Sequence, residues 1–86
     1  MQTDPRDIDP ALLRAWMVKY ICSVLGLDAA AFSATDRFDV YGLDSVEAVI
    51  MAGVMEEEFQ AAVDPHLFFD APSVDEFVAA FTAGPA

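Results

Sequence analysis

The residue best placed to do chemistry is a serine at the predicted start of a helix, in the segment Gly42-Leu43-Asp44-Ser45. Asp44 is suited to accept a hydrogen bond from a first-turn amide, and Glu47 is spaced to complete a capping box. Ser45 then takes the first helical position, where unpaired N–H groups and the positive end of the helix dipole favour a phosphodiester. Ser45 is therefore a candidate attachment point for a prosthetic arm, whereas taken in isolation a serine here is by default a surface residue at a helix start.

The predicted helix from residue 44 or 45 to about residue 60 has apolar residues on two sides. What we call the inner strip consists of Ala48, Met51, Ala52, Met55 and Phe59, and the outer strip of Val46, Val49, Ile50, Gly53 and Val54. We expect the inner strip in the core, because the large ring of Phe59 gains most from burial. The outer strip would then be exposed beside Ser45, with acidic residues at its end, which is typical of an interaction surface. In the alternative, a central helix buries both strips.

This outer surface supplies the candidate partner-docking residues. They are Asp44, Val46, Glu47, Ile50, Gly53, Glu56 and Glu57. The acidic side chains would meet basic residues of a partner, although they also fit a merely solvated face. Gly53 costs about 1 kcal/mol relative to alanine in mid-helix. It therefore indicates a close approach by the first helix or by a partner.

The remaining elements follow from capping and turn residues. Asp9-Pro10 opens a helix that Gly26 ends, so we expect it over residues 10–25. A short helical turn should follow Asp64-Pro65 and run through Phe69, and Ser73 with Glu76 should open a last helix that ends near Phe81. The long connection between the first two helices, residues 27–43, has four expected apolar anchors, namely Phe32, Phe38, Tyr41 and Leu43.

Neither strand-like alternation nor an internal repeat is visible, so the predicted fold class is all-α. We expect a small helical bundle of three longer helices and one short helix. Residues 1–8 are polar and read as a flexible lead-in, residues 9–82 as one domain, and residues 83–86 as a flexible tail. The aromatic residues expected in the core are Trp16, Phe38, Phe59, Phe77 and Phe81.

Composition limits the partners. The 86 residues include 15 acidic and 4 basic ones, which gives a net charge of −11. Nucleic acids and anionic membranes are therefore disfavoured, and proteins with basic patches are favoured. No apolar run reaches the roughly 20 residues of a membrane span, and no signal peptide is visible. With Cys22 as the single cysteine, we expect a cytoplasmic location, and we expect a monomer.

Other kinds of chemistry do not fit the spacing. Ser45 lacks the flanking glycines of a nucleophile elbow. The segment 36–44 lacks the ligand pattern of a calcium-binding loop, and one histidine with one cysteine is too few for a usual zinc site. We therefore predict no catalytic residue and no metal site.

Three segments together resemble the acyl carrier protein family. Phe38–Val46 looks like its phosphopantetheine attachment motif, whose common form is Gly-x-Asp-Ser-Leu. Met55–Phe59 looks like the end of the helix that follows the motif, and Phe68–Val74 resembles the segment before the last helix of polyketide synthase carrier domains. The likeness covers about residues 10–82. Val46 stands where the family usually has leucine or methionine, and the Gly-Gly-x-Ser pattern of peptidyl carriers is absent, which favours an acyl carrier.

The resemblance implies a non-catalytic carrier in polyketide biosynthesis. A separate phosphopantetheinyl transferase, using magnesium, would attach 4'-phosphopantetheine from coenzyme A to Ser45. The arm would hold acyl intermediates as thioesters and present them to a ketosynthase, an acyltransferase and other enzymes. Two alternatives remain, a carrier of the fatty-acid type and an unmodified acidic adaptor that docks basic proteins through the helix after Asp44.

Overall fold

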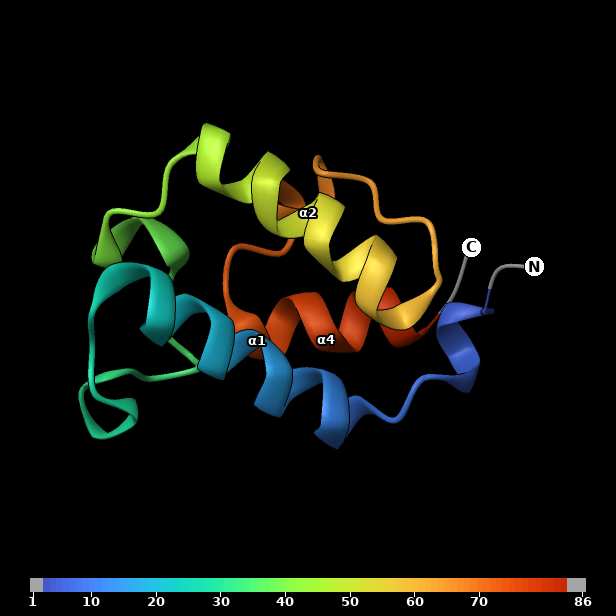
Figure 1. The fold of residues 1–86 in the computed structure, drawn as a ribbon, viewed down its shortest axis with the longest axis horizontal. Coiled ribbons are helices and arrows are strands. Elements are labelled where there is room, and N and C mark those ends of the chain that lie inside the picture. Colours follow the sequence, from blue (N-terminus) through green and yellow to red (C-terminus); the bar gives the residue numbers. More distant parts are fainter. Residues whose placement is uncertain (1–2, 84–86) are drawn as a thin grey trace.

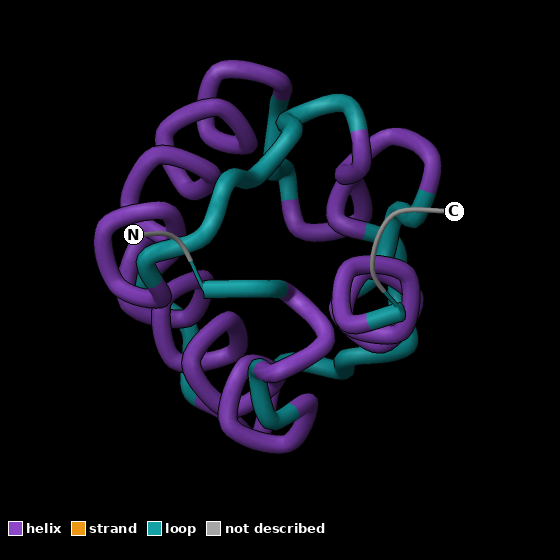
Figure 2. Tube along the Cα trace, turned by 90° about the vertical axis from the view of Figure 1, so that its right-hand side faces the viewer, coloured by secondary structure: helices purple, strands orange, loops and turns teal. Residues whose placement is uncertain are grey.

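The computed structural model describes residues 3–83, which form helices and loops and, within that range, no strand. The longer helices are α1 (Pro10–Leu25), α2 (Ser45–Phe59) and α4 (Val74–Thr82), and α3 (Leu67–Asp70) is a single turn. In Figure 1, α2 runs across the top of the molecule and α1 and α4 pack together below it. Figure 2 shows the helices arranged around a common interior. The predicted all-α bundle of three longer helices and one short helix is confirmed.

The helix boundaries are set by caps that the sequence contains. The Asp9 side chain accepts a hydrogen bond from the Ala11 amide at 3.0 Å, and α1 ends at Gly26 in the left-handed conformation, with φ 68°. At the start of α4, the Ser73 hydroxyl accepts from the Glu76 amide and donates to the Glu76 carboxylate, both at 3.2 Å. The predicted span of α1 is therefore confirmed, and so is the capping role of Ser73.

The short helix begins later than predicted. A turn closes first, in which the Leu67 amide donates to the Asp64 carbonyl at 3.0 Å, and regular α-helix follows from Leu67. Asp64 also accepts from the His66 amide at 2.9 Å through its side chain. Asp64-Pro65 therefore opens a turn that precedes the helix.

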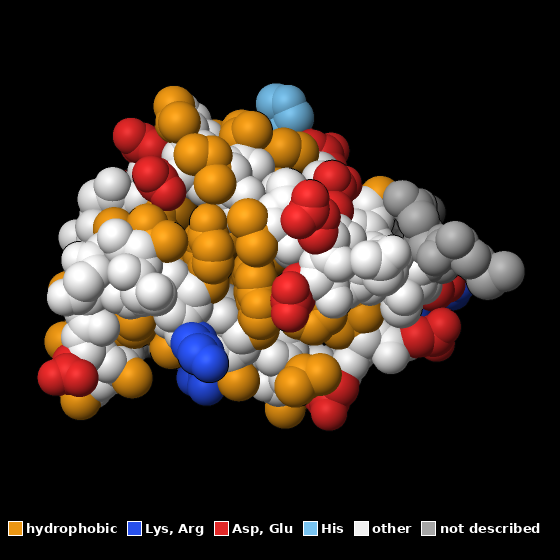
Figure 3. All heavy atoms as spheres, viewed as in Figure 1, with side chains coloured by type: hydrophobic (Ala, Val, Ile, Leu, Met, Phe, Trp, Pro, Cys, Tyr) orange, Lys and Arg blue, Asp and Glu red, His pale blue; other side chains and the backbone are white. Residues whose placement is uncertain are grey.

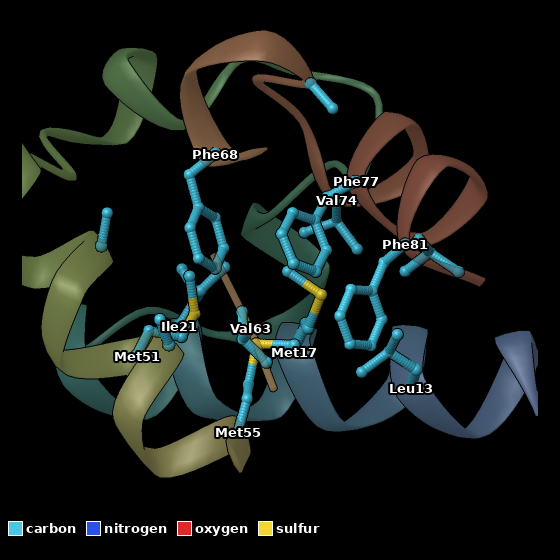
Figure 4. Packing of buried hydrophobic residues seen from close by; sticks show 14 of the residues in the cluster. Leu13, Met17, Ile21, Met51, Met55, Val63, Phe68, Val74, Phe77 and Phe81 are labelled. Carbon is cyan, nitrogen blue, oxygen red and sulfur yellow. The ribbon is translucent and has the colours of Figure 1, made fainter. Parts of the chain in front are cut away.

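The core is formed by side chains that α1, α2, α3 and α4 direct inwards, as Figure 4 shows. Fully or almost fully buried members are Leu13, Met17, Ile21, Met51, Met55, Phe68, Phe77 and Phe81. Phe68 stacks on Phe77 with ring centroids 4.3 Å apart. Of the five expected aromatic core residues, Phe38, Phe77 and Phe81 are buried. Trp16 and Phe59 are partly buried and meet edge to face at 5.6 Å.

Part of the expected lead-in at residues 1–8 is ordered and packed on the bundle. Pro5–Asp7 form a 3-10 helix that the Asp4 side chain caps, and Ile8 is buried in the core. The apolar side chain of Ile8 joins the core near α4, on which the 3-10 helix packs. Residues 1–2 of this lead-in, and residues 84–86 of the expected tail, lie outside the described residues.

The long connection between α1 and α2 is held at several points. The Phe32 and Tyr41 rings are 4.6 Å apart, and the Tyr41 hydroxyl accepts from the Ser33 amide at 2.8 Å and donates to Asp36 at 2.9 Å. Phe38 is buried, and its amide donates to the Pro72 carbonyl at 2.7 Å. These anchors fix the chain before it enters α2. Across residues 3–83, no helix has both the length and the apolar character needed to cross a membrane.

Candidate functional site

The chain reaches Ser45 through a tight turn. Phe38–Tyr41 form a 3-10 helix that ends at Gly42, whose φ of 81° lies in the left-handed region that favours glycine. The Gly42 amide donates to the Asp39 carbonyl at 3.1 Å, and the Leu43 amide to the Phe38 carbonyl at 3.2 Å. This turn ends the 3-10 helix and leads into α2, where Ser45 takes the first position.

The first turn of α2 keeps free donors next to Ser45. The Asp44 carboxylate accepts from the Glu47 amide at 2.9 Å, and the Asp44 carbonyl accepts from the Ala48 amide at 3.0 Å. Among the described residues, no hydrogen bond uses the amides of Ser45 and Val46, and Glu47 does not return a bond to Asp44. Asp44 therefore caps α2 as predicted. Within the described residues, the second hydrogen bond of a capping box, from the Asp44 amide to the Glu47 side chain, is not formed. Within the described residues, the amides of Ser45 and Val46 are therefore left without a hydrogen-bond partner at the positive end of the helix dipole.

Two serines stand at helix starts, and their surroundings differ. Ser73 is 1% exposed, and its hydroxyl is used in the cap of α4. Ser45 is exposed at the start of α2, and no hydrogen bond of the described residues engages its hydroxyl. The Ser45 side chain is thus accessible from solvent, and the Ser73 side chain is not.

A pocket of about 240 Å³ opens beside Ser45. Three segments line it: the 3-10 helix with Arg37 before it, the start of α2, and the end of α3 with the loop after it. Its apolar lining comes from Phe38, Leu43, Ala48, Phe68, Phe69 and Pro72. The packing of Phe38 edge to face on Phe68, with centroids 5.7 Å apart, holds two of these segments together. The sequence alone does not reveal this pocket, because its walls come from distant segments.

The two strips of α2 lie as predicted. In the inner strip, Ala48, Met51, Ala52 and Met55 are buried and Phe59 is partly buried. In the outer strip, Val46 is 64% exposed, Val49 54% and Ile50 48%. Figure 3 shows hydrophobic side chains gathered between α2 and α1 on one face, with acidic side chains at their border. The alternative in which both strips are buried is therefore excluded.

The remaining candidate docking residues are also accessible: Glu47 is partly exposed, and Asp44, Gly53, Glu56 and Glu57 are exposed. The surroundings of Gly53 and Glu56 bear on their predicted roles. A Cβ added to Gly53 would meet nothing within 4 Å, so α1 does not approach this glycine. The carboxylate of Glu56 accepts a hydrogen bond from the Val63 amide at 2.8 Å and ties the end of α2 to the next loop. Glu57, beside it, is exposed, and among the described residues no hydrogen bond uses its carboxylate.

Sequence reasoning missed three exposed residues in or next to the segments that line the pocket beside Ser45. Val40 is 66% exposed and Phe69 57%, and Arg37 lines the Ser45 pocket. Phe69 lies in α3, a single turn that is too short for a 3.6-residue period to assign a buried and an exposed face. Val40 lies in the 3-10 helix Phe38–Tyr41, which is too short for a periodic pattern to indicate which side chains are exposed.

Comparison with known sequences agrees with this geometry. A family model described as a phosphopantetheine attachment site matches residues 15–81. The chain is 26% identical over 76 residues to polyketide synthase PksL of Bacillus subtilis (strain 168). That alignment spans 88% of the chain and 2% of PksL, so the chain corresponds to a small part of that relative.

Two solved structures are similar along almost their whole length. The acyl carrier protein LipD from Actinoplanes friuliensis is 34% identical with a TM-score of 0.71, over 96% of this chain and 92% of LipD. A free-standing peptidyl carrier protein from an Acinetobacter baumannii secondary metabolic pathway is 21% identical with a TM-score of 0.79, over 87% and 94% of the two chains. At 21% identity, the similarity to the peptidyl carrier protein shows a shared fold and nothing more.

Proposed function

The chain belongs to the phosphopantetheine attachment-site family, whose domains carry a covalent 4'-phosphopantetheine group, and we propose that Ser45 is the residue that bears it. The observation that carries this proposal is the state of the Ser45 hydroxyl. It is exposed, free of hydrogen bonds within the described residues, and set at the first position of a capped helix beside a pocket. The buried and engaged Ser73 does not meet these conditions.

The chain's own contribution to attachment is positional. In the transfer, the Ser45 oxygen forms a bond to the phosphorus of the pantetheine phosphate, and the bond from that phosphorus to the nucleotide part of coenzyme A breaks. A separate phosphopantetheinyl transferase with magnesium supplies the base and the metal. The free amides of Ser45 and Val46 and the helix dipole then favour the new negative charge.

We propose that the chain is a non-catalytic acyl carrier of polyketide-type biosynthesis. Similarity to PksL and to the acyl carrier LipD supports this assignment. When bound, the arm supplies a terminal thiol that holds acyl groups as thioesters. The partners would be the transferase, a ketosynthase, an acyltransferase and other biosynthetic enzymes. The outer strip of α2 beside Ser45 is the surface on which they would dock, with Asp44, Glu47 and Glu57 meeting basic side chains.

Intact-mass measurement tests the attachment. The unmodified protein is incubated with coenzyme A, magnesium and a promiscuous phosphopantetheinyl transferase. We expect one phosphopantetheine increment in the wild type and none in Ser45→Ala. Ser23→Ala removes another exposed serine, on α1, and should be loaded like the wild type. A folded protein that gains no increment with several transferases would overturn the proposal and favour an unmodified adaptor.

A further inference from the structure

The surroundings of Ser45 are acidic, which is unfavourable for an attached phosphodiester. Asp39 and Asp44 line the same pocket as Ser45, and Glu47 follows in the first turn of α2. The whole chain carries a net charge of −11. Like charges that lie close together at a protein surface repel one another. A counter-charge near Ser45 would therefore stabilise the modified protein.

Arg37 is the basic side chain that lines this pocket. The other two arginines are engaged elsewhere, because Arg6 pairs with Asp4 and Arg14 with Asp75, each at 2.7 Å. Lys19 lines a separate hollow on α1. Arg37 is thus the cation with access to the first group of an arm on Ser45.

The guanidinium of Arg37 has donors to spare. Its Nε donates to Asp39 Oδ1 at 3.2 Å, and both side chains are about two-thirds exposed, 64% and 65%. Within the described residues, no hydrogen bond uses its two terminal nitrogens. An arginine has five N–H donors in a planar fork that matches a phosphate. Arg37 therefore has the capacity to bind a phosphodiester while it keeps its contact with Asp39.

The backbone of Arg37 is held in place relative to the pocket. Arg37 pairs with Ser73 in an isolated antiparallel bridge, and the Phe38 amide donates to the Pro72 carbonyl at 2.7 Å. Asp75 donates its amide to the Ala34 carbonyl at 3.0 Å on the other side of the bridge. The backbone at Arg37 is thus tied to the loop before α4, and the exposed side chain is the part of Arg37 that remains free to turn toward the pocket.

We propose that Arg37 binds the phosphodiester that joins the arm to Ser45 and so fixes the first part of the arm at the pocket. This inference rests on the proposed attachment at Ser45. The side-chain contact would partly offset repulsion from Asp39 and Asp44, and it would limit the directions in which the arm leaves the protein.

Nuclear magnetic resonance compares the unmodified and the loaded protein. Loading should shift the Arg37 Nε–H resonance and leave that of Arg14 unchanged. The ³¹P resonance of the phosphodiester should move in loaded Arg37→Gln and stay in place in loaded Arg14→Gln, which removes an arginine of similar exposure. Arg37→Lys keeps the charge without the planar fork and should give an intermediate shift. Circular dichroism checks that each variant is folded.

Three results would overturn the inference. One is an Arg37 resonance that does not respond to loading, and another is a ³¹P resonance that is the same in the wild type and Arg37→Gln. The third is a shift of the Arg37 resonance that appears only when the arm carries an acyl group with a carboxylate. Arg37 would then bind the acyl group and not the phosphodiester. In each case the mass of the loaded protein still supports attachment at Ser45. A protein that is never loaded at Ser45 contradicts both proposals.

Discussion

The Glu56 carboxylate accepts a hydrogen bond from the Val63 amide at 2.8 Å, and Glu57, the next residue, makes no such contact among the described residues. The two acids looked equivalent in the sequence, as members of one acidic rim. In the structure, Glu56 holds the loop after α2 against the helix, and Val63 is buried in the core just beyond it. Glu56 therefore has a structural role that Glu57 lacks.

Alanine substitution should separate these roles. Glu56→Ala should lower the free energy of unfolding by about 1 kcal/mol, because the Val63 amide loses its charged acceptor. Glu57→Ala removes the same charge and should stay within about 0.5 kcal/mol of the wild type. Urea unfolding followed by circular dichroism measures both. Equal stability of the two variants would show that the Glu56 contact contributes nothing.

Substitution of Gly53 tests whether a partner protein packs closely against the outer strip of α2. Nothing lies within 4 Å of an added Cβ, so Gly53→Ala should raise the free energy of unfolding by up to about 1 kcal/mol through helix propensity. If a partner packs against this glycine, the same variant should lower kcat/KM of the partner enzyme for the loaded protein. Unchanged kcat/KM would show that Gly53 does not mark a contact with that enzyme.

Ile50 tests the docking role of the outer strip. Ile50→Gln leaves the net charge of the protein unchanged and replaces an apolar side chain that is 48% exposed with a polar one. We expect kcat/KM for a partner enzyme to fall about tenfold, which corresponds to roughly 1.4 kcal/mol, with little change in stability. Val24→Gln is the matched control, because Val24 is 44% exposed on α1. Equal losses in both variants would contradict docking on α2, and a large loss of helicity in Ile50→Gln would place Ile50 in the core.

Tyr41 gives the connection before Ser45 a dependence on alkaline pH. The hydrogen bond from the Ser33 amide is the largest influence and lowers the pKa of Tyr41, but burial and the hydrogen bond to Asp36 together raise it above 10.0. The fold therefore favours the neutral phenol. Its stabilising contribution is complete below pH 10.0 and is lost as the pH rises through the higher pKa of the folded state.

Phenolate absorbance of Tyr20→Phe measures this pKa, since Tyr41 is then the single tyrosine. The midpoint should lie above 10.0 and should fall in the double variant with Asp36→Asn. A midpoint at or below 10.0, or one that Asp36→Asn leaves unchanged, would contradict the role of Asp36.

The features that sequence predicts well are those set by neighbours along the chain. Asp9 and Gly26 bound α1, Ser73 caps α4, and the 3.6-residue period assigns the inner and outer strips of α2. Each depends on side chains within one turn or on one helix face. Ile8, a buried apolar residue within the lead-in, belongs to no such pattern, which is why its place in the core was missed.

The features that sequence does not predict require distant segments to meet. The Ser45 pocket needs Phe38 and Phe68 in contact, and the position of Arg37 depends on its pairing with Ser73. The Glu56–Val63 contact spans a loop of irregular structure. These relations follow from tertiary packing, which no local period encodes. The family resemblance indicated Ser45 but not the cation beside it.

Site localisation of the arm tests the central claim most directly. Cleavage of the loaded protein after Arg37 and Glu47 releases residues 38–47, in which Tyr41 and Ser45 are the hydroxyl-bearing residues. Tandem mass spectrometry should place one phosphopantetheine on this peptide and, within it, on Ser45. The increment on any other peptide, such as one that contains Ser73, or on Tyr41, would contradict the assignment of Ser45.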